Sequence, residues 1–241
     1  MYTTCPKCGH KRKPGEGTAD ACAACGLIYA KYIKQRFAAH PDDAPVTESH
    51  TQHKVRELLL DQPGEEAYAS YARMALLVGL AIYGVKLARM DVPDWEMASS
   101  LIHLPMVPIH EFGHIAFMAF GDFMHLLGGS LFQAGLPIAF ACVFLRRRDP
   151  FAAAVMLWWS SIAVMDIAPY VYDAQQPMHV LLTGRTGETG AHDFIDVLGD
   201  LGLLTRAQAV GYSVHRVGVA MLAVALAWGA AILLRAWRAK S

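Results

Sequence analysis

Two histidines and a glutamate form the most specific chemical signature in this sequence. His110, Glu111 and His114 fit the pattern H-E-x-x-H. On a helix, residues i and i+4 lie on one face a single turn apart, so both imidazoles can bind the same Zn²⁺. Glu111 then lies beside them, where it can act as the general base for a zinc-bound water. The motif predicts a zinc-dependent hydrolase.

A catalytic zinc needs a third protein ligand and one open coordination position. The carboxylates of Asp166 and Asp173 are candidates for this ligand, and so is the pair His192-Asp193. In that pair we expect His192 to be the ligand and the neighbouring carboxylate to orient its ring. The residue types alone leave these alternatives open.

Four cysteines predict a second metal site, near the N-terminus. Cys5 and Cys8 form one CxxC pair and Cys22 and Cys25 form another, 13 residues later. Two such pairs let four thiolates converge on one Zn²⁺. The alternative, two disulfides, needs an oxidising compartment, and the first long apolar stretch begins only near Met74. We therefore expect a zinc site here. Residues 1–36 resemble the small zinc ribbons that open many bacterial membrane proteins, and this resemblance implies a structural or partner-binding role.

The composition separates this polar N-terminal part from an apolar remainder. The 241 residues are 54% hydrophobic and 17% charged, whereas soluble domains are about 25% charged. Segments 123–145 and 217–234 contain no Asp, Glu, Lys or Arg, and about 20 such residues cross a bilayer core. Lys and Arg together number 21, as do Asp and Glu, so we expect no nucleic-acid partner.

These features predict a mainly α-helical fold, in which a polytopic membrane domain over 70–241 follows the ribbon and a polar linker over 37–69. The linker is expected to hold one short helix near 55–60. The membrane domain should contain four or five apolar segments: 70–90, 97–120, 123–145, 150–172 and 212–236.

The H-E-x-x-H motif lies inside one of these apolar segments, 97–120. Ionisable residues in such a segment are expensive to bury in lipid and point to function, and zinc gives a reason for their presence. The alternative is a polar cluster that only joins helices. Pro108 suits the first turn of a helix, so we expect the motif to open a helix after a break at 105–108.

The chain resembles the site-2 protease family of intramembrane zinc metalloproteases. Members of that family have HExxH in one transmembrane helix and N-x-x-P-x-x-x-x-D-G in a later one. The aspartate of the second motif completes their zinc site. Residues 166–174 read DIAPYVYDA. The resemblance therefore implies that Asp173 is the third ligand. The match has Asp166 in place of asparagine, one residue fewer before Asp173, and alanine in place of the final glycine, so His192 and Asp166 stay as alternatives.

Basic residues predict the orientation in the membrane. Residues 1–36, Arg146–Arg148 and the C-terminal basic cluster should be cytoplasmic by the positive-inside rule. This requires 97–145 to cross the membrane an odd number of times. A re-entrant hairpin over 122–135, around Gly128 and Gly129, would satisfy the requirement, whereas the family resemblance favours two spans. The glycines could also offer an extended edge to a substrate, or only allow close helix packing.

Together these features predict a membrane-embedded zinc metallopeptidase that hydrolyses membrane or membrane-proximal proteins. We expect a multi-pass protein of the bacterial inner membrane with a cytoplasmic N-terminus. It should hold one catalytic and one structural Zn²⁺. Its expected partners are the lipid bilayer, a protein or peptide substrate, and a protein that binds the ribbon. The alternatives are a non-catalytic scaffold with structural zinc sites and a metal-handling membrane protein.

Overall fold

The computed structural model describes residues 3–13, 15, 16, 18, 20–36, 50–62, 67–179, 184, 186 and 192–239. They fall into two compact units, 1–52 and 53–241. The part of the chain that the structure describes is mainly helical, with 74% of its residues in helices. This confirms the expected fold class, a helical domain with a cysteine cluster near the N-terminus that fits a small zinc-ribbon site.

The N-terminal unit repeats one turn twice around its cysteines. In the first turn Gly9 N–H donates to Cys5 O, and in the second Gly26 N–H donates to Cys22 O. Both glycines have positive φ, 70° and 68°, a backbone conformation that glycine adopts without a Cβ clash. Isolated bridges pair Thr4 with Lys11 and Ala21 with Ile28. Helix α1 follows over Tyr29–Arg36.

Four helices of the second unit are long and apolar enough to cross a membrane. They are α3 (Ala67–Ala88), α5 (Asp122–Arg146), α6 (Pro150–Asp173) and α8 (Ala207–Arg238). Their outer surfaces expose apolar side chains such as Ile82, Val143 and Val224. An extended exposed apolar surface is rare on soluble monomers and is what lipid would cover. The segments expected at 70–90, 123–145, 150–172 and 212–236 correspond to these four helices.

Shorter elements complete the second unit. They are α2 (His50–Leu60), η2 (Glu96–Ser99), α4 (His103–Phe117), η3 (Met118–Phe120), α7 (Asp193–Asp200) and η4 (Leu204–Arg206). Helix α4 and the η3 turn that directly follows it have 15 and 3 residues and extend together for about 28 Å. This stretch carries three histidines and Glu111, and it is not among the four helices of the described residues that are long and apolar enough to cross a membrane. The expected segment 97–120 therefore supplies no candidate span.

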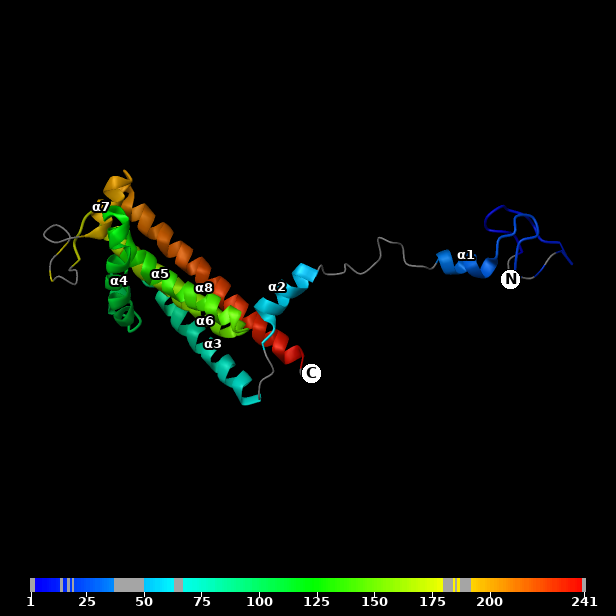
Figure 1. The fold of residues 1–241 in the computed structure, drawn as a ribbon, viewed down its shortest axis with the longest axis horizontal. Helices are drawn as coiled ribbons and strands as arrows, with labels where there is room; N and C mark the ends of the chain where they lie inside the picture. Colours follow the sequence, from blue (N-terminus) through cyan, green and yellow to red (C-terminus); the bar gives the residue numbers. More distant parts are fainter. Residues whose placement is uncertain are drawn as a thin grey trace. The chain divides into compact units, whose positions relative to one another are not determined.

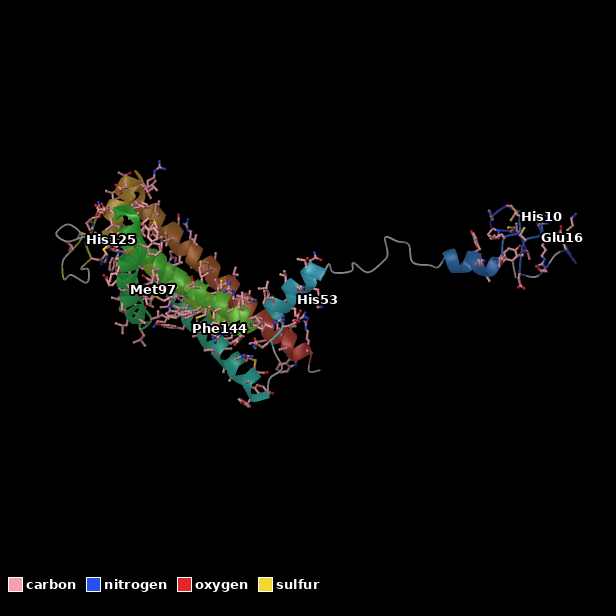
Figure 2. All side chains as sticks on the ribbon, in the orientation of Figure 1. His10, Glu16, His53, Met97, His125 and Phe144 are labelled. Carbon is pink, nitrogen blue, oxygen red and sulfur yellow. The ribbon has the colours of Figure 1, made fainter. Side chains whose placement is uncertain are left out.

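The two ends of the helical unit differ in what packs there. Helices α4 and α7 gather at one end of the long helices, whereas α2 lies near the C-terminus at the other (Figure 1). At the α2 end, Trp228 Nε1 donates to Leu59 O, and Arg148 pairs with Glu57 at 2.9 Å. In Figure 2, His125 marks the α7 end, while His53 lies near the opposite end. We call these the α7 end and the α2 end.

Helix α4 begins earlier than the sequence predicts. It starts at His103, so Pro108 lies inside the helix and not in its first turn. The expected break at 105–108 is therefore wrong. Pro108 lacks the N–H that would bond to Leu104 O, but proline in a helix interior is tolerated where neighbouring helices support the backbone.

Helix α5 runs unbroken through Gly128, Gly129 and Pro137. The re-entrant hairpin over 122–135 and the extended substrate edge are therefore both wrong. The glycines instead allow α4 to approach closely: a Cβ at Gly128 would lie 2.5 Å from Phe117 Cβ, and one at Gly113 would lie 2.5 Å from Gly128 O. Residues 97–145 thus supply one span-length helix.

Candidate metal centre

The two histidines of the HExxH motif meet a carboxylate that the sequence analysis did not choose. Asp193 Oδ2 lies 3.5 Å from His110 Nε2 and 3.3 Å from His114 Nε2. One ligand atom from each of these three residues lies within 4.8 Å of the other two. We call His110, His114 and Asp193 the metal group.

Hydrogen bonds on the far side of each ring decide which imidazole nitrogen faces Asp193. His110 Nδ1 lies 2.9 Å from Gln133 Oε1, and His114 Nδ1 lies 2.8 Å from the carbonyl of His125. Both oxygens can only accept, so each Nδ1 must carry the proton. The neutral rings then present unprotonated Nε2 atoms, which are the form that binds a metal.

Asp193 is held at the first residue of α7 by Tyr170. The Asp193 N–H donates to the Tyr170 hydroxyl at 3.0 Å, and this hydroxyl donates to Asp193 Oδ2 at 3.2 Å. Behind it, Phe194, Val197 and Leu198 of α7 are buried against α6 and α8. Although burial opposes ionisation, the hydrogen bond from the Tyr170 hydroxyl acts to lower the pKa of Asp193, so the carboxylate is available as an anionic ligand.

Glu111 shares a cavity with the metal group. The cavity has a volume of about 680 Å³ and is lined by both imidazoles, Asp193 and Glu111. Apolar side chains, including Val107, Ile115 and Ile167, form much of its remaining wall. A carboxylate thus lines the same cavity as the three candidate ligands, and this space is large enough for part of a peptide.

Asp173, which the family resemblance implied as the third ligand, contacts His192 instead. His192 Nε2 lies 3.6 Å from Asp173 Oδ2, and both side chains are at most 2% exposed. The other Asp173 oxygen accepts the N–H of Met178. The structure therefore brings neither Asp173 nor the alternative ligand His192 into the metal group. The His192 ring contacts the Tyr170 ring, with centroids 4.3 Å apart and planes tilted by 31°.

Asp166, the last of the expected alternatives, is joined to the metal group through Gln133. Gln133 Nε2 donates to Asp166 Oδ2 at 2.8 Å, while Gln133 Oε1 accepts from His110. His103 Nδ1 also binds Asp166, at 2.9 Å, and this hydrogen bond raises the pKa of His103 against the opposing effect of burial. Asp166 therefore orients Gln133, which in turn fixes the tautomer of His110.

The four N-terminal cysteines converge as the sequence predicts. Their sulfurs form one group, with Cys5 Sγ 3.8 Å from Cys25 Sγ and Cys8 Sγ 3.7 Å from Cys22 Sγ. Four sulfurs about 2.3 Å from a tetrahedral zinc ion would lie about 3.8 Å apart. The observed spacing therefore fits such an ion.

The thiols of this cluster respond differently to their surroundings. Backbone N–H groups of Cys25 and Ala24 lower the pKa of Cys22 to about 6, although burial opposes this. For Cys8 the N–H of His10 acts in the same direction, but hydrogen bonds with the neighbouring thiols and burial raise its pKa to about 12. Crowded thiols without a cation thus resist full ionisation, and a metal ion would relieve this.

No family model, no curated protein and no solved structure matches this chain. Its function is therefore inferred from its residues and their geometry.

Sequence reasoning missed Asp193 as the residue that meets the imidazoles, although it considered the pair to which Asp193 belongs. Adjacent helical residues point about 100° apart, so the choice between His192 and Asp193 depends on where α7 begins. In the structure His192 is the extended residue before the helix and Asp193 is its first residue. The strong amphipathic pattern of 193–200 signals this helix but does not give its rotation relative to α4.

Proposed function

We propose that this chain is a membrane-embedded zinc metallopeptidase with His110, His114 and Asp193 as metal ligands and Glu111 as general base. The observation that carries the proposal is the metal group itself, which lines one cavity together with Glu111. This assignment keeps the HExxH chemistry of the site-2 protease resemblance and replaces its expected third ligand, Asp173, with Asp193.

The residues present fit a zinc ion. Nitrogen and oxygen ligands lie about 2.0–2.2 Å from zinc, so two ligands of a tetrahedral site are about 3.3–3.6 Å apart. The distances from Asp193 Oδ2 to the two imidazole nitrogens, 3.5 and 3.3 Å, fall in this range. Two neutral imidazoles and one carboxylate also form a donor set that zinc hydrolases use.

Zinc held by this group would act as a Lewis acid that polarises a peptide carbonyl and makes water more acidic. Glu111 is the chain's own proton carrier, because its carboxylate lines the same cavity. It would take a proton from the attacking water and pass it to the leaving amine, as general acid–base catalysis requires. Gln133 and the His125 carbonyl hold the two imidazoles in place during this cycle.

The number of ligands favours catalysis over a structural metal site. Structural zinc sites are closed by four protein ligands, whereas catalytic sites have three and leave one position open. Within the described residues the metal group has three members, while the cysteine cluster has four. The non-catalytic scaffold would need a fourth protein ligand at the metal group.

Replacing Glu111 tests the proposed function. Glu111→Gln should retain the metal, because Glu111 is not a ligand, and should abolish hydrolysis, because the amide cannot accept the proton. Membrane fractions from cells that produce the wild-type chain or the variant can be compared by profiling new protein N-termini. We expect cleavage products that depend on Glu111, and bound zinc unchanged in the variant.

Two outcomes would contradict the proposal. Identical N-terminal profiles for wild type and Glu111→Gln, with zinc bound in both, would favour a non-catalytic scaffold. Metal that exchanges freely at the metal group, with no products in either sample, would favour a metal-handling protein. Glu96→Gln, in the exposed 3₁₀ turn before α4, is the matched control and should behave as wild type.

A further inference from the structure

The charges at the two ends of the long helices are unequal. On the four long helices and the turn after α5, the α2 end carries Arg73, Arg146, Arg147, Arg148, Arg235 and Arg238. Lys54 and Arg56 of α2 add to this end. The α7 end has four described basic residues, Lys86, Arg89, Arg206 and Arg216. Because loops rich in Lys and Arg stay in the cytoplasm, the charges favour a cytoplasmic α2 end.

The order of the helices agrees with this assignment. The chain runs from the α2 end to the α7 end in α3, returns in α5, and repeats this path in α6 and α8 (Figure 1). Within 97–145, α5 is the one helix that is long and apolar enough to span a membrane, so we take this stretch to cross the membrane once. Arg146–Arg148 and Arg238 therefore lie on the same side of the membrane as the start of α3, which resolves the conflict that the sequence left between charge and family resemblance.

Contacts between the helices give the depth of the metal group. A Cβ at Gly218 of α8 would lie 2.4 Å from Met165 of α6, and His215 Nε2 lies 3.1 Å from Ala88 O. Met165 precedes Asp166, and the contact between Ala88 and His215 lies within two residues of Lys86 and Arg216. Asp166 therefore lies at the same depth as Lys86 and Arg216, the charged residues at which the apolar parts of α3 and α8 end. It lies 17 residues from Asp149 along α6, or about 25 Å from the α2 end.

The metal group lies about one helical turn farther out than Asp166. Gln133 contacts Asp166, whereas Gly129, one turn earlier in α5, faces the two Nε2 atoms: its Cβ would lie 2.5 and 2.7 Å from them. One turn adds about 5 Å, which gives about 30 Å from the α2 end along α6. Along α5, Gly129 lies 17 residues, or about 25 Å, from Arg146. Both lengths are close to the roughly 30 Å thickness of a hydrocarbon core.

We propose that the metal group lies at the extracytoplasmic boundary of the membrane, and that its substrates are polypeptide segments at that surface, such as the juxtamembrane parts of membrane proteins. This substrate class rests on the proposed peptidase function, whereas the position of the metal group does not. The location also explains how three ionisable ligands and Glu111 avoid the cost of the bilayer centre.

Cysteine labelling in intact cells tests the position without any need for activity. In a Cys142→Ala background, Leu201→Cys places a thiol at an exposed site after α7, and Arg147→Cys places one at an exposed site after α5. Neither residue belongs to the metal group. A membrane-impermeant maleimide should label Leu201→Cys in intact cells with the outer permeability barrier opened, and should label Arg147→Cys only after the inner membrane is permeabilised. The Cys142→Ala parent gives the background from the ribbon thiols.

The reverse labelling pattern would overturn the inference, because it would place the metal group at the cytoplasmic surface. Labelling of both reporters in intact cells would also overturn it, since the two ends would then share one side. Neither result would test the peptidase function, which the comparison of wild type with Glu111→Gln tests separately. If labelling is as expected but no cleavage products depend on Glu111, the proposed peptidase function is rejected and the proposed position of the metal group is retained.

Discussion

At the scale of single residues, the function depends on which nitrogen of each imidazole is free. Gln133 and the carbonyl of His125 accept from Nδ1 of His110 and His114, and this leaves both Nε2 atoms unprotonated. Asp166 fixes the Gln133 amide by accepting from its nitrogen. The metal group is therefore supported by residues that do not touch the metal, and their loss typically lowers metal affinity by about 10–100-fold.

Gln133→Leu tests this support. Leucine has a similar volume but cannot accept from His110, so His110 loses its preferred tautomer and orientation. We expect zinc affinity at the metal group to fall by about 10–100-fold, measured by competition with a chelator of known affinity in the purified full chain.

The matched control is Gln208→Leu, on α8 and outside the cavity, which should leave the affinity unchanged. Equal affinities for wild type and Gln133→Leu would mean that the Gln133–His110 hydrogen bond does not hold the metal-binding tautomer.

At the scale of elements, the crossing of α4 and α5 decides whether the imidazoles can reach Asp193. Gly113, Gly128 and Gly129 form the contact, and each would clash if it carried a side chain. Gly129 is the most sensitive of these positions for function, because a Cβ there would meet His110 Nε2 at 2.5 Å and His114 Nε2 at 2.7 Å.

Gly129→Ala should therefore displace both rings. We expect loss of zinc from the metal group and a decrease of about 1–3 kcal/mol in the free energy of unfolding, as for other overpacked sites. Zinc content and thermal unfolding of the purified protein measure the two effects.

Gly135→Ala is the control, because a Cβ at this position of the same helix meets nothing within 4 Å. It should retain zinc and unfold no earlier than wild type, since alanine favours a helix over glycine by about 1 kcal/mol. If Gly129→Ala also kept its zinc, the rings would have room that the structure does not give them.

The sequence predicts the elements better than their relations. Apolar stretches without charge locate the four long helices, because length and hydropathy are local properties. The sequence does not give the start of α4, because Pro108 also fits a helix interior once α5 supports it. It does not distinguish Asp173 from Asp193 for a related reason: both are acidic residues near apolar segments, and only the packing of α7 against α6 brings Asp193 to the imidazoles. The cysteine cluster, in contrast, can be predicted from the sequence, because two adjacent turns determine the whole cluster.

At the scale of the whole molecule, the described residues contain two candidate metal sites of different kinds, one in each of two separate units. The cysteine cluster lies in 1–52 and the metal group in 53–241. The first has four possible ligands and the second has three, and under the proposed function these correspond to a structural and a catalytic zinc. Because the sites share no residues, removal of one should leave metal binding at the other intact.

The number of zinc ions bound by purified variants of the full chain tests the central claim most directly. Wild type should bind two zinc ions, Asp193→Ala should bind one, and Asp193→Ala combined with Cys5→Ser and Cys22→Ser should bind none. Asp173→Ala, at the carboxylate that the family resemblance implied, should still bind two. Two zinc ions in Asp193→Ala and one in Asp173→Ala would contradict the assignment of Asp193 as the third ligand.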